Sequence, residues 1–172
     1  MRLAAPEPFM PTPLPSARPV TAALSADPAP HGAGQSIGAA AGEREFRALC
    51  SAFRNSGGML RGDDLARLLE DHRCGDFVSL ARFISRHEIF SFDWREAVWV
   101  PMFQFDLRDL SIRPGPQRVL AELGGAYDGW ALASWFSQPN VWLRGARPVD
   151  LLDADLGHVL RAARADRFVA KG

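Results

Sequence analysis

The chain has 172 residues, a formal net charge of zero and a hydrophobic share of 47%. This length suits one domain of ordinary size or two small ones, and the composition suits a globular protein with a core. A neutral chain has no overall attraction for nucleic acid or anionic lipid. No apolar run approaches the roughly 20 residues that span a bilayer, and Pro6 and Glu7 interrupt the N-terminus too early for a signal peptide. The sequence therefore predicts a cytoplasmic protein without a membrane anchor.

Sequence motifs that carry enzymatic or metal chemistry are absent. The chain has no P-loop, no glycine-rich dinucleotide motif, no H-E-x-x-H and no paired C-x-x-C. Cys50 and Cys74 stand too far apart for a zinc site and fit inert thiols in a reducing compartment. The four histidines are scattered, and Ser79 and Ser137 lack the context of a catalytic nucleophile. We therefore expect no enzymatic activity, no cofactor and no metal ion.

Residues 1–42 have the composition of a disordered tail. Eight prolines lie between residues 6 and 30, and glycine and alanine dominate the stretch 32–42. Such a segment buries too little apolar surface to offset the entropy of ordering it. A plain solvated tail is the prediction, and a docking site for a proline-binding partner is the alternative.

Helical spacing begins after this tail. Residues 43–55 place apolar side chains on one face, with acidic residues at the end where the helix dipole favours anions. Asp63 or Asp64 is predicted to cap a second helix, and Asp76 a third helix that runs to His87. The inward residues of the three helices are predicted to be Phe46, Leu49, Cys50 and Phe53; Leu65, Ala66, Leu68 and Leu69; and Phe77, Leu80, Ala81 and Ile84.

The second and third helices, joined by a tight turn at residues 72–75, fit a helix-turn-helix. The outward residues of the third helix are the predicted DNA contacts, namely Ser79, Arg82, Ser85 and Arg86. Strands predicted at residues 88–92 and 98–105 form an antiparallel hairpin, like the wing of a winged-helix domain. Pro101 indicates that the second strand is an edge or bulged strand, because proline cannot donate to a ladder.

The charge of residues 43–110 does not favour DNA binding. These residues include ten arginines, no lysine and twelve acidic residues. Nonspecific affinity for DNA depends on cationic side chains that contact phosphates. The helix-turn-helix is therefore either a weak or dimer-dependent DNA binder, or a module that binds only protein.

Residues 111–172 are predicted to be helical apart from short linkers. Pro116 suits the start of one helix, Asp128 is expected to cap the next, and Asp153 or Asp155 the last. The apolar residues of the last two of these helices are Trp130, Ala131, Leu132, Trp135 and Phe136, and then Val159, Leu160, Ala163 and Phe168. The last helix also carries a solvated stripe of Arg161, Arg164 and Arg167.

A constrained loop follows the aromatic helix. Pro139 ends that helix, Gly145 permits a turn that other residues resist, and Pro148 suits the first position of a further short helix. Within the loop, Trp142 is expected to be partly exposed and Leu143 buried. The reason is that neighbouring side chains of an extended segment point to opposite sides.

This loop carries a resemblance to a known family. Pro139-Asn140, Leu143, Gly145, Pro148 and Leu151-Leu152 resemble the pattern P-N-x-x-L-x-G-x-x-P-x-x-L-L of the Xre/MbcA/ParS-like toxin-binding domain, which lies at the C-terminus of many bacterial antitoxins. The resemblance covers roughly residues 117–172. In addition, residues 101–106 resemble a P-x-x-Q-F-D run that members of this group often show after a short hairpin. The family pairs with RES-type toxins, which consume NAD.

The resemblance implies an antitoxin-like protein whose C-terminal helices cover the substrate entrance of a RES-type toxin and whose helix-turn-helix represses its own operon. The residues expected at the partner interface are Trp135, Phe136, Pro139, Asn140, Trp142, Leu143, Gly145, Arg164 and Arg167. Large apolar side chains are expected to be the anchors, and Asn140 is expected to orient the loop by hydrogen bonds. The alternative is an orphan interaction scaffold without a DNA or toxin partner.

The predicted fold class is therefore mainly α. A winged helix-turn-helix-like domain with a short β-hairpin spans residues 43–110, and a small all-α toxin-binding domain spans residues 111–172. A homodimer is compatible with this organisation, and the sequence leaves the oligomeric state open.

Overall fold

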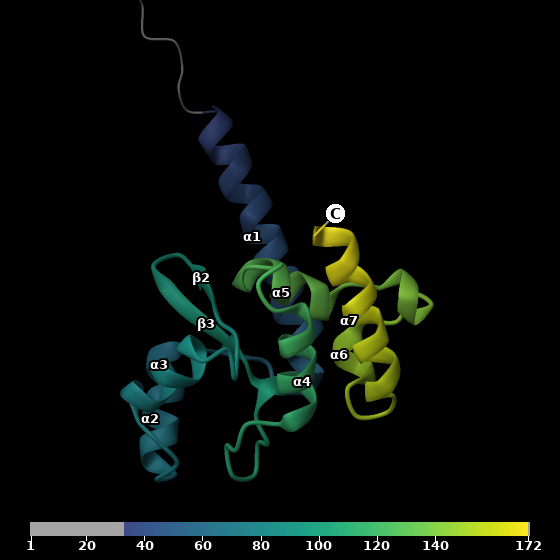
Figure 1. The fold of residues 1–172 in the computed structure, drawn as a ribbon. Helices are drawn as coiled ribbons and strands as arrows, with labels where there is room; N and C mark the ends of the chain where they lie inside the picture. Colours follow the sequence, from purple (N-terminus) through teal and green to yellow (C-terminus); the bar gives the residue numbers. More distant parts are fainter. Residues whose placement is uncertain (1–32, 172) are drawn as a thin grey trace, which may run out of the picture.

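The computed structural model describes residues 33–171, and residues 1–32 of the expected tail lie outside that range. The described chain is mainly helical with a small three-stranded antiparallel sheet, in agreement with the expected mainly α class (Figure 1). Its helices are α1 (Ala33–Phe53), α2 (Gly62–Asp71), α3 (Phe77–Ser85), α4 (Pro114–Leu123), α5 (Gly129–Ser137), α6 (Pro148–Leu151) and α7 (Leu156–Lys171). Its strands are β1 (Met59–Arg61), β2 (Phe92–Trp94) and β3 (Ala97–Pro101), and its 3-10 helices are η1 (Arg54–Ser56), η2 (Met102–Gln104) and η3 (Val141–Leu143).

Helix α1 begins within the stretch that the composition assigned to the tail. It starts at Ala33, ten residues before the periodic segment that begins at Glu43. Alanine is the best helix former, and extending an existing helix costs less than nucleating one. The amphipathic segment after residue 43 therefore propagates N-terminally through the alanine-rich stretch. Among the described residues, no helix is long and apolar enough to cross a membrane.

The helix caps are confirmed in part. Asp76 caps α3 by accepting from the backbone N–H of Ser79 at 2.7 Å, and Asp128 caps α5 by accepting from Ala131 at 2.7 Å. Asp155 rather than Asp153 accepts from the first turn of α7, at 3.0 Å from His158 N. Two predicted helix boundaries differ from the observed ones. Helix α4 begins at Pro114 instead of Pro116, and α3 ends at Ser85 instead of His87.

Asp63 and Asp64 do not cap α2. Both lie inside its first turn, and Arg61 occupies the N-cap position without a side-chain hydrogen bond. The carboxylates still stand beside the positive end of the helix dipole. Three of its four predicted inward residues, Leu65, Ala66 and Leu69, are buried, and the fourth, Leu68, is partly buried.

The predicted hairpin is present, but its strands and its place in the sheet differ. Arg95 and Glu96 form a two-residue turn, both with positive φ (47° and 59°), which is the backbone of a type I′ hairpin. Strand β1 was not foreseen; it pairs with β3, so the strand order is β1-β3-β2. Strand β3 is therefore central, and the prediction of an edge strand from Pro101 is wrong. Proline is tolerated because it is the last residue of the strand.

Residues 88–91 are not a strand because a side chain takes the place of a neighbouring strand. The Gln104 amide accepts from Phe90 N at 2.8 Å and donates to Phe90 O at 3.0 Å. It also donates to Pro101 O at 3.0 Å. Gln104 is fully buried, so these three bonds satisfy polar groups that water cannot reach.

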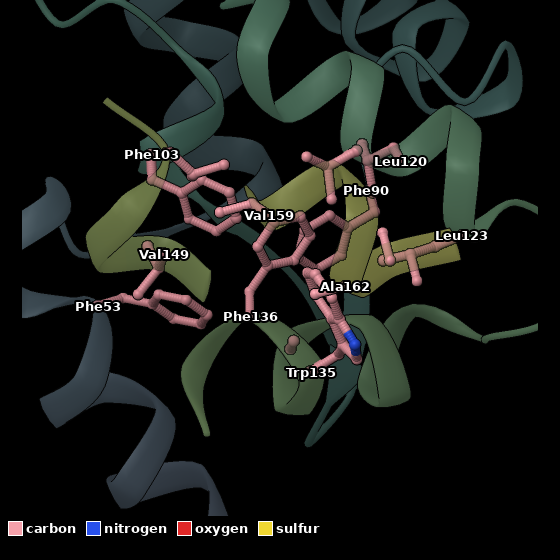
Figure 2. Packing of buried hydrophobic residues seen from close by; sticks show 14 of the residues in the cluster. Phe53, Phe90, Phe103, Leu120, Leu123, Trp135, Phe136, Val149, Val159 and Ala162 are labelled. Carbon is pink, nitrogen blue, oxygen red and sulfur yellow. The ribbon is translucent and has the colours of Figure 1, made fainter. Parts of the chain in front are cut away.

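Two hydrophobic clusters lie on the two faces of the sheet. The smaller cluster joins α2 and α3 to Leu60 and Val100, and the larger one joins α1 and α4–α7 to Phe92 and Trp99. Figure 2 shows the centre of the larger cluster, where Phe136 lies between Phe90 and Phe103, with ring centroids 5.7 and 4.8 Å away. The boundary expected at residue 110 therefore does not separate the clusters, because the first helix packs on the C-terminal helices.

Candidate protein-binding site

Asn140 fixes the backbone of the loop between α5 and α6. Its side-chain oxygen accepts from Trp142 N at 2.9 Å and so caps η3. Its carbonyl oxygen accepts from Leu143 N at 3.0 Å and from Gly145 N at 2.9 Å, and its own N–H donates to Ala146 O at 3.0 Å. Gly145 has φ +83°, the left-handed conformation that glycine adopts without strain. These local bonds hold the loop in one shape, as expected of Asn140.

The three residues of η3 differ sharply in exposure. Leu143 is 3% exposed, Trp142 49% and Val141 84%. The expected contrast between Trp142 and Leu143 is confirmed, but its reason is different. The segment is a 3-10 helix, in which successive side chains point roughly 120° apart, and not an extended strand.

The Asp166 carboxylate on α7 is the centre of the site, and sequence reasoning missed it. Its Oδ2 accepts from Trp135 Nε1 and from Asn140 Nδ2, both at 2.7 Å. Its Oδ1 accepts from Trp142 Nε1 at 2.8 Å. In addition, the Tyr127 hydroxyl donates to the Asp166 backbone oxygen at 3.3 Å. One carboxylate therefore connects α5, the loop and α7.

This arrangement holds Trp142 in a defined orientation while half of its surface stays exposed. Trp142 donates its indole N–H to Asp166 and its backbone N–H to the Asn140 side chain. An aromatic side chain fixed in this way loses little conformational entropy when it binds a partner. Trp142 is therefore a half-exposed apolar side chain with a preorganised orientation.

A cavity of about 420 Å³ lies beside the fixed loop. It is lined by Tyr127, Ala131, Ser134, Trp135, Gln138, Pro139 and Asn140. Three of these residues, Tyr127, Trp135 and Asn140, are the ones that bond Asp166. Burial raises the pKa of the Tyr127 phenol, which therefore stays protonated and able to donate. The surface thus combines a protruding side chain with an adjacent hollow of fixed walls.

Two residues expected as interface anchors belong to the core instead. Phe136 is fully buried, and Trp135 is nearly so, with its indole N–H bonded to Asp166. The physical reason is that α5 is apolar on most of its circumference and is covered by α1, β2 and α6. Their predicted contact with a partner is therefore wrong for this conformation, and their role is to support the loop from beneath.

Arg164 and Arg167 bind another helix of the same chain. Arg164 donates to Glu122 Oε1 on α4 at 2.9 and 2.6 Å, and Arg167 lies 3.7 Å from Glu122 Oε2. The hydrogen bond from Arg164 lowers the pKa of Glu122. Both arginines remain partly exposed, so their predicted contact with a partner stays a prediction.

The exposed apolar residues near the C-terminus differ from the expected ones. Phe168, which the sequence pattern grouped with the apolar residues of the last helix, is 80% exposed, and Val169 is also exposed. Phe168 follows Arg164 by four positions and Arg161 by seven, so it shares their solvent-facing side of α7. The periodic pattern alone could have revealed this conflict, since Phe168 cannot lie on both faces of the helix.

The predicted DNA contacts on α3 are only partly available. Arg82, Ser85 and Arg86 are exposed, but Ser79 is half-buried and its hydroxyl donates to Asp76 at 2.7 Å. The inward stripe is also different. Leu80 is buried and Ile84 half-buried, whereas Phe77 and Ala81 are exposed because no element of the described chain covers that side of α3.

Comparison with known proteins adds no relative. No family model, curated protein or solved structure matches this chain. Among the described residues, no group of three or more histidine, cysteine, aspartate or glutamate side chains could hold a metal ion. The functional assignment therefore depends on the geometry of the loop and on the sequence resemblance.

Proposed function

We propose that the C-terminal half of this chain is a protein-binding domain of the antitoxin type, and that its partner is a RES-type toxin. The supporting observation is Trp142, which is half-exposed and fixed by Asp166, in a loop whose residues Pro139 and Asn140 line a cavity. Large aromatic side chains next to concave, well-packed surfaces are the usual hot spots of protein interfaces. The chain would act sterically, by covering the substrate entrance of the toxin, and would supply no catalytic group.

The residues that resemble the family pattern give the loop its shape. Pro139 follows the end of α5, Asn140 caps η3, Leu143 is buried and Gly145 supplies the positive φ. Trp142 stands at a variable position of that pattern. We therefore assign the shared residues to the scaffold and Trp142 to the specificity of this chain for its own partner.

The proposal extends to the N-terminal half, which we interpret as a winged helix-turn-helix. The element order α1-β1-α2-α3-β2-β3 and the strand order β1-β3-β2 support this interpretation. In this arrangement α3 would be the recognition helix, and Arg82 and Arg86 would contact phosphates of an operator upstream of the chain's own gene. The acidic balance of residues 43–110 implies weak binding.

An interaction scaffold without a toxin or DNA partner is the second candidate. It is favoured by the exposed apolar residues at the start of α3, where Phe77 is 61% and Val78 69% exposed. Large apolar side chains at this end of a recognition helix fit a protein surface better than a phosphate backbone. Binding to a RES-type toxin would distinguish the antitoxin-type protein from the scaffold, because only the antitoxin-type protein is expected to bind one.

The decisive experiment is co-expression with a RES-type toxin encoded beside this gene. The full chain should co-purify with the toxin and should suppress its consumption of NAD in a purified assay. Trp142→Ala should weaken the complex by about 2 kcal/mol or more. Leu107→Ala is a matched control, because Leu107 is similarly exposed but lies in another loop. A toxin that neither binds the chain nor loses activity in its presence would contradict the proposal.

A further inference from the structure

An apolar groove lies between α3 and the hairpin, on the opposite side of the sheet from the larger cluster. Its volume is about 340 Å³. Its apolar lining consists of Phe77, Leu80, Ala81, Ile84, Ala97 and Val98, and its charged rim consists of Arg61, Asp63 and Glu96. Phe77 and Val98 are 61% and 39% exposed, so the groove is open to solvent.

The sequence pattern of α3 is that of a helix with a covered apolar face. Phe77, Ala81 and Ile84 recur at helical spacing, and such a stripe normally packs against another element. Within the described chain Leu80, which neighbours this stripe, is buried, whereas none of the three stripe residues is fully covered. An apolar surface left open in this way commonly marks an interaction site.

The charges around the groove indicate what covers it. Arg61, Asp63 and Glu96 are exposed, and none of them forms an ion pair with another described residue. A rim that carries both signs is complementary to itself when a two-fold axis brings the positive part of one copy to the negative part of the other. The zero net charge of the chain means that two copies do not repel each other.

We propose that this groove is the interface of a homodimer, in which Phe77 of each copy packs into the groove of the other and Arg61 of one copy faces Glu96 of the second. The interface is isologous, because Phe77 is both a wall of the groove and its most exposed aromatic group. The groove is lined by ten residues, fewer than the roughly 20–30 that each partner contributes to a standard interface, so the dimer dissociates at micromolar concentration. This inference goes beyond the proposed toxin binding, which uses the loop at residues 139–145.

Sedimentation of the full chain from about 1 to about 200 μM covers the range in which a weak dimer dissociates. The mean mass of the wild type should rise from 18.9 kDa toward twice that value. Phe77→Asp should raise the dissociation constant by roughly 30-fold or more, because it places a carboxylate in the apolar groove. Phe168→Asp is the matched control, since Phe168 is an exposed phenylalanine on α7, and it should sediment like the wild type. Circular dichroism melts establish that both variants are folded.

The charge pairing has its own test. Arg61→Glu and Glu96→Arg should each weaken the dimer by about tenfold, because each places like charges opposite one another. An equimolar mixture of the two variants should recover a heterodimer. Single variants that sediment like the wild type would overturn the pairing of Arg61 with Glu96.

Two other outcomes would overturn a homodimer at this groove. A wild type that stays monomeric at every concentration removes the second copy as the occupant. If such a monomer binds duplex DNA and Phe77→Asp abolishes that binding, the groove side of α3 is a DNA-binding surface. Loss of the dimer in Phe168→Asp but not in Phe77→Asp would place the interface on α7.

Discussion

Trp142 donates its indole N–H to the Asp166 carboxylate at 2.8 Å, although the two residues are 24 positions apart in the sequence. The same carboxylate accepts from Trp135 and Asn140. It therefore connects a half-exposed side chain to the core of the C-terminal helices. The orientation of Trp142 therefore depends on this acidic group as well as on the residues of the loop pattern.

Replacing Asp166 should both destabilise the fold and release the loop. Asp166→Ala leaves three N–H donors without their acceptor, two of them partly buried, which should cost about 2 kcal/mol of unfolding free energy. Tryptophan fluorescence should also shift, and acrylamide should quench it more strongly, because Trp142 is no longer held. Asp93→Ala, at an exposed aspartate on β2, is the control and should change neither quantity. Unchanged fluorescence in Asp166→Ala would contradict the role of this carboxylate.

Alanine at the two neighbouring loop positions should affect stability and partner binding differently. Leu143→Ala removes a buried side chain and should lower the unfolding free energy by roughly 2–5 kcal/mol. Trp142→Ala should lower it by less, because half of that side chain already contacts solvent, but it should weaken partner binding by about 2 kcal/mol or more. Denaturant unfolding and a pull-down with the toxin measure the two quantities. A Trp142→Ala protein that binds fully would remove this loop from the interface.

Gln104 should be intolerant of substitution although it is not part of the proposed interface. Gln104→Ala deprives Phe90 of partners for both its N–H and its carbonyl oxygen inside the core, and leaves a cavity. Buried unsatisfied polar groups cost about 1–3 kcal/mol each, so urea unfolding should show a loss of several kcal/mol, roughly 2–5. Gln138→Ala, at an exposed glutamine, should lie within about 0.5 kcal/mol of the wild type. Equal stability of the two variants would refute the assignment.

Stability should fall in acid partly through Glu122. The hydrogen bond from Arg164 lowers the pKa of this carboxyl in the folded state. A lowered folded pKa stabilises the fold at pH values above the unfolded pKa of about 4.3, and this contribution is lost as the pH falls through the folded pKa. Between neutral pH and the acid side of that window, Glu122→Gln should therefore lose less stability than the wild type. Glu70→Gln, at an exposed glutamate without an ion pair among the described residues, should follow the wild-type curve.

Any DNA binding should depend on the arginines of α3. Arg82→Ala together with Arg86→Ala should reduce the slope of log affinity against log salt by about two, one for each arginine that no longer neutralises a phosphate. Binding to the upstream region of the chain's own gene, measured at several salt concentrations, gives this slope. A wild type that does not bind this region at low salt would leave only the protein-binding interpretation of the N-terminal half.

The sequence by itself determined the features that depend on neighbouring residues. Asp76 and Asp128 cap their helices through bonds to residues three positions away, and Pro139 and Gly145 shape the loop through their own backbone preferences. These interactions are set by spacing along the chain, so a local pattern is enough to predict them.

Only the tertiary structure decided which distant groups meet. In the sequence, Asp166 is one acidic residue among arginines, and Gln104 is an ordinary polar residue. In the fold, Asp166 accepts a hydrogen bond from Trp135, and Gln104 accepts one from Phe90. The same is true of α3, whose apolar stripe predicts burial although only Leu80 is fully covered and Phe77 and Ala81 stay exposed. Periodicity shows that a face is apolar, whereas the path of the whole chain decides whether that face meets the core, a partner or solvent.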